Sequence, residues 1–320
     1  MRLARRALPA LLLLPGLARA SAWPDKPVRI VIPFAPGGPN EPLNRILAEW
    51  LTRRLGQPFV IENRPGATGT VGAQQVMRAA PDGATLLYSA NTGMVVAPLL
   101  LKSAGYDAAR DFTPVAVAQS YGLYIVVGAQ LPIRSLDELI AYAKARPGQL
   151  NYTTPGTGSV GHLATASFCR LAGIEMQHVS FGGTTAGLLA IIRGDAHVAF
   201  DSVGNAQALV EEGKLRGIAV TSAERNPRVP GIPTASELGF PWFPSEVWMG
   251  LYAPPGLPEP ILRKLSAEVE ACLADNDVRG RLQGLGFTPG GGGPGEVTRR
   301  ILQERPGWVA AMELAGLRQE

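Results

Sequence analysis

Cysteine and histidine are scarce in this sequence, which has only two cysteines and three histidines in 320 residues. His162, His178 and His197 do not have the spacing of metal ligands, and neither a C-x-x-C nor an H-E-x-x-H motif occurs. The sequence therefore predicts no metal site. Cys169 and Cys272 each lie in an apolar helical pattern, which favours two separate buried thiols over a disulfide without deciding between them.

Hydrophobic runs long enough to cross a membrane are missing as well. The run from Ala7 to Leu17 is too short to span a bilayer and follows three arginines. Small residues after it complete the pattern of a secretory signal peptide, with cleavage after Ala22 as first choice and after Ala20 as second. We therefore expect residues 1–22 to be removed and the protein to work in the periplasm, where disulfides are also permitted.

An excess of charge of one sign is absent once the signal peptide is removed. The first 22 residues hold four arginines and no acid, which leaves 26 basic and 26 acidic residues. Nucleic-acid binding requires a basic patch or stripe, so this balance argues against a nucleic-acid partner.

A dinucleotide site also lacks one of its parts. Gly156, Gly158 and Gly161 have the G-x-G-x-x-G spacing, with a strand expected before them and a helix after them. The next strand, however, ends in Phe181 and Gly182 instead of the acidic residue that would bind a ribose. The sequence therefore predicts neither NAD nor any other cofactor.

What the sequence does contain is a repeated unit that starts at Val28: a β-branched run, a loop rich in glycine and small polar residues, and an amphipathic helix. Such alternation predicts an α/β fold with parallel strands joined by helical crossovers. One helix should start near Pro42, stop at Gly56 and bury one face. The residues of that face are Leu43, Ile46, Leu47, Trp50, Leu51 and Leu55.

Two segments after the first units have their own signatures. The run FTPVAVAQSYGLYIVVGA, residues 112–129, predicts strands without a helix between them, as in a crossover between two lobes. Ser135 and Glu138 have the spacing of a capping box at the start of the following helix. A second set of strand, loop and helix units follows, and helical stretches close the chain.

The loops between these strands and helices share one chemical character. Their side chains are mainly hydroxyls and amides, and their glycines expose backbone N–H groups just before helices. Unpaired N–H groups at a helix N-terminus attract anions. Because ligands of open α/β sheets bind beyond the carboxyl ends of the strands, these loops predict a carboxylate site in a cleft between the lobes.

Catalytic interpretations find less support. A nucleophile elbow requires G-x-S-x-G, but the first glycine around Ser159 is displaced, and His162 favours a hydrogen bond or ligand contact over a triad. Asp201 ends a strand and more often would cap the next helix than act as a hydrolase acid. Arg64 is as well placed to pair with Glu62 or Glu41 as to bind a ligand carboxylate.

The motifs together resemble one family. WPDKPVRIVIPFAPGGPNE, VIENRPGATGTVGA, PDGATLLYSA, LNYTTPGTGSVGHLA, FDSVGNAQALVEEGKLRGIAVTSA and WMGLYAPPGLPEPILRKL are similar, in this order, to the Bug family of periplasmic solute-binding proteins. These proteins are receptors of tripartite tricarboxylate transporters. The resemblance implies a two-lobed, type II periplasmic-binding (Venus-flytrap) fold that performs no chemistry. We expect residues 23–122 and 249–320 to form lobe 1 and residues 123–248 to form lobe 2.

The resemblance also implies a set of ligand-binding positions, mostly in the loops after the strands. They are Phe34, Ala35, Gly37, Gly38, Asn40, Thr68, Gly69, Ser89, Asn91, Thr157, Gly158, Ser159, His162 and Asp201. Pro39, Asn40 and Glu41 depart from the Gly-Thr-Asp common in the family, and Pro155 stands where a small residue is usual. These departures affect the identity of the ligand more than the fold.

The function implied is the capture of a small organic acid by a monomeric protein, which delivers it to membrane permease subunits of a tripartite tricarboxylate transporter. A di- or tricarboxylate, an aromatic acid and an amino acid are the candidate ligands. A ligand-sensing subunit without a transport role and a secreted hydrolase or dehydrogenase are the alternatives. Trp248 and Tyr121 either line the cleft or pack between the lobes, and packing is slightly favoured.

Overall fold

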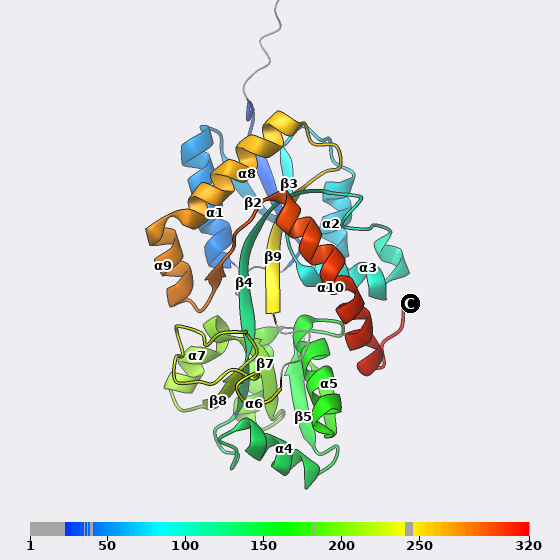
Figure 1. Ribbon diagram of the computed structural model, residues 1–320, viewed down its shortest axis with the longest axis vertical. Coiled ribbons are helices and arrows are strands. Elements are labelled where there is room, and N and C mark those ends of the chain that lie inside the picture. The colour runs from blue at the N-terminus through cyan, green and yellow to red at the C-terminus, as the bar shows by residue number, and fades with distance from the viewer. Residues whose placement is uncertain are drawn as a thin grey trace, which may run out of the picture.

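The chain forms two groups of strands and helices that share one long strand (Figure 1). The computed structural model describes residues 23–34, 36, 38, 41–181, 183–240 and 246–319. The predicted signal peptide, residues 1–22, lies outside the described residues. No helix within those ranges is long and apolar enough to cross a membrane.

The elements alternate as the sequence predicts. The first group is β1 (Val28–Ile32), α1 (Glu41–Leu55), β2 (Phe59–Asn63), the 3-10 turn η1 (Ala67–Gly69), α2 (Thr70–Met77), β3 (Thr85–Ala90), the π-helical turn η2 (Thr92–Val96), α3 (Ala97–Leu100) and η3 (Lys102–Ala104). The second is β4 (Thr113–Gly128), α4 (Leu136–Lys144), β5 (Leu150–Thr154), α5 (Val160–Ala172), β6 (Met176–Ser180), α6 (Thr184–Arg193), β7 (Val198–Ser202), α7 (Val203–Glu211) and β8 (Leu215–Val220). The chain closes with β9 (Glu246–Ala253), α8 (Glu259–Ala274), α9 (Asn276–Gly284), β10 (Thr288–Pro289) and α10 (Pro294–Leu314).

The described strands lie in the order β2-β1-β3-β9-β4-β7-β5-β6, and β8 and β10 also pair with β4. Strand β1 is parallel to β2 and β3, and β5 is parallel to β6 and β7. Strand β9 runs antiparallel to both β3 and β4. The first group, with α8 and α9, forms the upper part of the molecule in Figure 1 and is called the upper group; the second group is the lower one. In the upper group α1 and α9 lie on one side of the strands and α2 and α3 on the other (Figure 1).

Strand β4 belongs to both groups. Its residues Thr113 to Gly122 pair with β9, and Leu123 to Val127 pair with β7. Every residue from Val115 to the end of the strand is buried. Burial on both faces explains why the sequence shows a continuous apolar run instead of the alternation of a half-exposed strand.

The predicted buried face and end of α1 and the predicted start of α4 are confirmed. In α1 the side chains of Leu43, Leu47 and Leu51 are buried, and Gly56 ends the helix with a left-handed φ of 78°. In α4 the hydroxyl of Ser135 accepts a hydrogen bond from the Glu138 backbone N–H at 3.2 Å. The Glu138 carboxylate accepts from the N–H of Arg134, one residue before the position of a standard capping box.

The aromatic and cysteine side chains left undecided by the sequence are now placed. Trp248 in β9 is buried and its indole N–H donates to both carboxylate oxygens of Glu304 in α10, at 2.9 Å each. Tyr121 is buried and packs edge-on against Phe287. Both therefore pack in the interior. Both cysteines are free; Cys272 is buried and Cys169 half-buried.

We predict that Trp248→Phe lowers the free energy of unfolding by about 1 to 3 kcal/mol, because the partly buried Glu304 carboxylate loses one of its two indole donors and keeps only Trp308. Burial already raises the pKa of Glu304, so its charge depends on such donors. Urea denaturation measures the change. Trp50→Phe is the matched control, since within the described residues the Trp50 indole nitrogen has no hydrogen-bond partner. Equal losses in the two variants would contradict the prediction.

Candidate functional site

The carboxyl ends of the two sets of parallel strands face each other along β4. Strand β3 ends where Ala90 pairs with Met249, which in turn pairs with Gln119 of β4. From the opposite direction β7 ends where Ser202 pairs with Leu123. Four residues of extended strand span about 13 Å, so the loops after both sets meet at one junction. This is where ligands of open α/β sheets bind.

On the upper side of this junction the loop before α2 has a constrained backbone. Ala67 and Thr68 have positive φ values of 42° and 55°, and Gly66 and Gly69 are also in the positive-φ region. Non-glycine residues seldom adopt this conformation, and it concentrates at functional sites. Gly69 precedes α2 without a side-chain cap. The Thr70 N–H donates to the Ala67 carbonyl of η1, so Val71 and Gly72 are the next residues whose N–H groups lie in the uncapped first turn.

Ser89 and Asn91, at the end of β3, are completely buried next to that loop. In the described structure the Ser89 hydroxyl oxygen and the Asn91 side-chain oxygen have no hydrogen-bond partner, while the Asn91 amide donates to the carbonyl of Glu246 at 3.2 Å. A Cβ added to Gly93 would lie 2.8 Å from the Ser89 oxygen and 3.5 Å from the Thr68 carbonyl oxygen. The predicted residues Thr68, Gly69, Ser89 and Asn91 therefore form one polar group.

The loop after β1 is described only in part. The carbonyl of Phe34 accepts a hydrogen bond from the Asn63 side chain at 2.9 Å, which links the ends of β1 and β2. The Gly38 carbonyl accepts from the N–H of Glu41 at the start of α1. The predicted site residues Ala35, Gly37 and Asn40 lie outside the described residues.

The loop before α5, residues 155–159, forms the lower side of the junction. Ser159 caps α5, and its hydroxyl accepts from the His162 backbone N–H at 3.2 Å. Gly158 has a φ of 76°, and a Cβ there would lie 2.6 Å from a methyl carbon of Leu100 in α3. The loop of Thr157, Gly158 and Ser159 therefore touches the upper group of elements across the junction.

His162 lies behind this loop and is only 5% exposed. Its Nδ1 accepts the Gly158 N–H at 3.1 Å, and its ring stacks on His178 with 4.0 Å between centroids. Burial, followed by the neighbouring His178, lowers the pKa of His162 to about 4. The ring is thus neutral at pH 7 and offers no positive charge to an anion.

Asp201 lies at the end of β7 opposite Tyr124 of β4 and is 7% exposed. One carboxylate oxygen accepts from the Ser202 backbone N–H at 2.6 Å and from the Asn205 amide at 3.0 Å. Burial raises the pKa of Asp201 to about 6, against the effect of these two bonds. The expectation that Asp201 caps the next helix is wrong, because Ser202 caps α7 by accepting from the Asn205 N–H.

Several contacts of the site could not be anticipated. His178 and Leu100 are brought to the loop before α5 by elements distant from it in sequence, and no local pattern indicates them. Arg64 is exposed and pairs with Glu62 at 2.5 Å, and this bond lowers the pKa of Glu62. Of the two expected roles of Arg64, the ion pair with Glu62 is therefore confirmed. Among the described residues, no group of three or more histidine, cysteine or acidic side chains could hold a metal ion.

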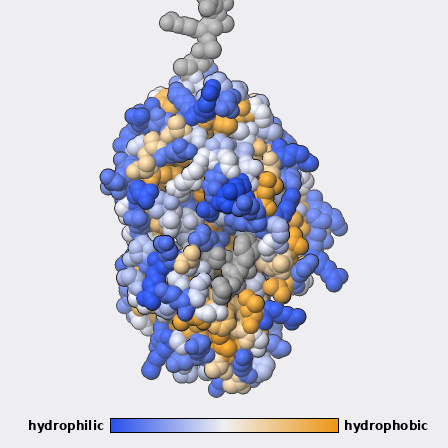
Figure 2. All heavy atoms as spheres, viewed as in Figure 1, coloured by the Kyte–Doolittle hydropathy of each residue, from blue (hydrophilic) through white to orange (hydrophobic). Residues whose placement is uncertain are grey.

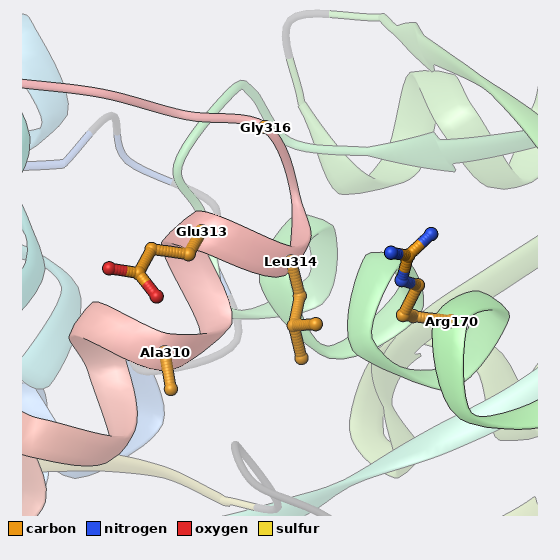
Figure 3. Close-up of a pocket in the computed structure, with 5 residues that line it drawn as sticks. All are labelled: Arg170, Ala310, Glu313, Leu314 and Gly316. Atoms are coloured by element: carbon orange, nitrogen blue, oxygen red, sulfur yellow. The ribbon is translucent and has the colours of Figure 1, made fainter.

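A hollow of about 410 Å³ lies elsewhere, between α5 and the end of α10. It is lined by Arg170, Ala310, Glu313, Leu314 and Gly316, with Arg170 and Glu313 on opposite sides of Leu314 (Figure 3). Hydrophobic residues gather on the surface where α10 passes α5 (Figure 2). Ten residues of helix separate Arg170 from the start of α5, about 15 Å, so this hollow is distinct from the junction of strand ends.

Comparison with known proteins identifies the family of this chain. A family model described as the tripartite tricarboxylate transporter family receptor matches residues 43–310. The chain belongs to this family. Its members are solute-binding receptors. The predicted Bug-type resemblance and the two-lobed α/β fold of the periplasmic-binding class are both confirmed.

Three solved structures resemble this receptor along most of its length. The structure of R. palustris Rpa4515 with adipate is 34% identical with a TM-score of 0.87, covering 93% of this chain and all of that one. MatC from Rhodopseudomonas palustris with bound malate is 35% identical with a TM-score of 0.81, covering 90% and 99%. The periplasmic binding protein BugD is 30% identical with a TM-score of 0.83, covering 93% and 100%.

For this receptor we predict that Asp201→Asn raises the free energy of unfolding at pH 8 by about 3 kcal/mol, because the folded pKa lies about two units above the unfolded value. Such a raised pKa penalises the charged form above pH 6, and proton uptake relieves the penalty as the pH falls. The gain should therefore shrink between pH 6 and pH 4. Urea denaturation at both extremes measures it.

The control for Asp201→Asn is Asp195→Asn, which removes an exposed carboxylate paired with Arg193 and should change stability by less than about 1 kcal/mol. A loss of stability in Asp201→Asn at pH 8 would contradict the assignment of a buried, penalised carboxylate.

Gly161→Ala should destabilise the receptor by about 1 to 3 kcal/mol, because the added Cβ would lie 2.8 Å from the Phe200 carbonyl oxygen and push α5 away from β7. Gly280→Ala is the matched helix control. No atom lies within 4 Å of its added Cβ, so helix propensity should stabilise α9 by up to about 1 kcal/mol. Thermal unfolding compares the two, and a stabilised Gly161→Ala would refute the close approach.

Proposed function

We propose that this receptor binds a small organic carboxylate in the periplasm by closing its two lobes over it, and delivers it to the membrane permease of a tripartite tricarboxylate transporter. The observation that carries the proposal is the junction of strand ends. There the uncapped N-terminus of α2 and the buried Ser89 oxygen belong to the upper group, and the loop of Gly158 and Ser159, which approaches Leu100 of that group, belongs to the lower one. The similar structures of Rpa4515 with adipate and of MatC with bound malate support this class of ligand.

The energy of such a site does not require a positively charged side chain. A hydrogen bond to a charged group contributes about 1.5 to 3 kcal/mol, while micromolar affinity needs about 8 kcal/mol. Backbone N–H groups near the start of α2 and the hydroxyls of Ser89 and Ser159 together reach this range after the cost of ordering the ligand. The α2 dipole adds to the attraction of an anion.

The Ser159 hydroxyl retains a donor for a ligand. Its oxygen already accepts the His162 backbone N–H, which leaves the O–H proton directed elsewhere. The His162 imidazole accepts from Gly158 and not from Ser159. Ser159 therefore has no imidazole base in this structure, which favours binding over nucleophilic catalysis.

The cellular location, the lobe boundaries, the monomeric state and the ligand contacts are proposed from the sequence. The pattern of residues 1–22 supports export to the periplasm. We propose residues 23–122 with 249–320 as lobe 1 and residues 123–248 as lobe 2, in a protein that works as a monomer. The proposed ligand contacts are the loop residues given above, from both lobes.

The test is isothermal titration of residues 23–320 with adipate and with malate, comparing Ser159→Ala with Ser135→Ala. Both serines cap a helix with the same 3.2 Å bond, so each variant should lose about 1 kcal/mol of stability. Only Ser159→Ala should also weaken binding, by about ten- to a hundredfold, because it loses a charge-assisted hydrogen bond.

The neutral diamide of adipic acid should not bind, which separates charge recognition from shape. Equal binding of the diamide and adipate would contradict the anion proposal. If both serine variants bound adipate and malate with equal affinity, Ser159 would not be a ligand contact, although the protein would still bind carboxylates.

A further inference from the structure

Two stacked histidines hold both ends of the loop before α5. At one end, Thr154 donates to the carbonyl of Gly156 at 3.2 Å, and its hydroxyl oxygen lies 2.7 Å from Nε2 of His178. At the other end, the Gly158 N–H donates to Nδ1 of His162 at 3.1 Å. The two rings stack 4.0 Å apart with an angle of 17° between their planes. The loop is thus tied to a single pair of rings.

The hydrogen bond from Gly158 determines the protonation state of His162. A nitrogen that accepts an N–H must carry a lone pair, so Nδ1 of His162 has no proton and the neutral ring is protonated on Nε2. A second proton on His162 would occupy Nδ1 and remove the only acceptor that the described structure gives to the Gly158 N–H. It would also place a positive charge against the stacked ring of His178.

We propose that His162 is a positioning residue: its neutral ring fixes Gly158 and thereby the binding loop, so ligand affinity requires His162 to be uncharged. The inference rests on the proposed function, in which this loop contacts the carboxylate. It assigns His162 a different role from the direct ligand contact expected from the sequence. Glycine at position 158, with a φ of 76°, has no side chain with which to hold its own conformation.

One ionisable group in direct contact with His162 is the stacked His178, and burial lowers the pKa of this ring as well. Tyr152 of β5 stacks on both rings, and burial raises its pKa and that of Cys169 on the same helix, so both are neutral below pH 8. Arg170 and Glu313 lie at the far end of α5, beside α10. Asp201, at the end of β7, titrates near pH 6 and bonds to Ser202 and Asn205.

The positioning role and a direct cationic contact predict opposite pH dependence. A protonated histidine that touched the ligand would strengthen carboxylate binding as the pH falls. A histidine that must stay neutral weakens binding by up to about tenfold per pH unit once it takes up a proton. The sign of the pH profile therefore distinguishes the two roles.

The experiment compares wild type, His162→Asn and His162→Leu from about pH 7 to about pH 4, with adipate and malate as probes. Asparagine keeps an acceptor near the Nδ1 position but does not titrate, while leucine removes the acceptor. We expect His162→Asn to bind within a few-fold of wild type at pH 7 and His162→Leu to bind at least tenfold more weakly. Circular dichroism checks that each variant is folded.

The ratio of wild-type to His162→Asn dissociation constants removes the titration of the ligand itself. We expect this ratio to rise as the pH falls toward 4, both in the native background and with Asp201→Asn, which removes the titration of the Asp201 carboxylate. If the ratio instead decreased as the pH was lowered, and His162→Asn bound weakly at pH 7, the proposal would be overturned in favour of a direct cationic contact.

A ligand-free readout separates this inference from the proposed function. Nitrogen NMR of the imidazoles should show His162 protonated on Nε2 at pH 7, and the Gly158 amide should lose its protection from hydrogen exchange as His162 titrates. This result without binding of either acid would refute the proposed ligand class and leave the positioning role of the ring in place. An unprotected Gly158 amide at pH 7 would refute the positioning role.

Discussion

The pairing of one buried strand, β4, with partners that all run against it determines the geometry of the candidate site. Because β9 and β7 both lie antiparallel to β4, β3 and β7 approach the same stretch of it from opposite directions. The carboxyl ends of two parallel sheets are thereby brought to one junction. The close approach of Gly158 to Leu100 shows that the two groups touch there. The other features of the site depend on this opposition.

The two sides of the junction offer different chemistry. The upper side presents backbone, because a run of left-handed residues leads into α2 without a capping side chain. On the lower side α5 and α7 are both capped by serines, and the loop before α5 is held by an imidazole. Buried Asp201, whose pKa is raised, costs stability that an amide would not, which is typical of functional positions.

Local features of the fold were predictable, whereas contacts between distant elements were not. The buried face of α1, the stop at Gly56 and the Ser135 cap follow from neighbouring residues, and the apolar run indicates β4. The loops of the candidate site were found because glycine and small polar residues before helices have a direct physical meaning. The stacking of His162 on His178 depends on which strand lies beside α5, information that no local spacing contains. The sequence predicts Asp201 as the cap of the next helix, whereas Ser202 caps α7, because either residue fits the local pattern.

The central claim, that one carboxylate is held by both sides of the junction, is tested most directly by a backbone amide NMR titration of residues 23–320 with adipate or malate. The account predicts that the amides of Val71 and Gly72 shift together with those of Gly158 and Ser159, with one dissociation constant. Shifts confined to one side, or centred on the hollow between α5 and α10, would contradict it.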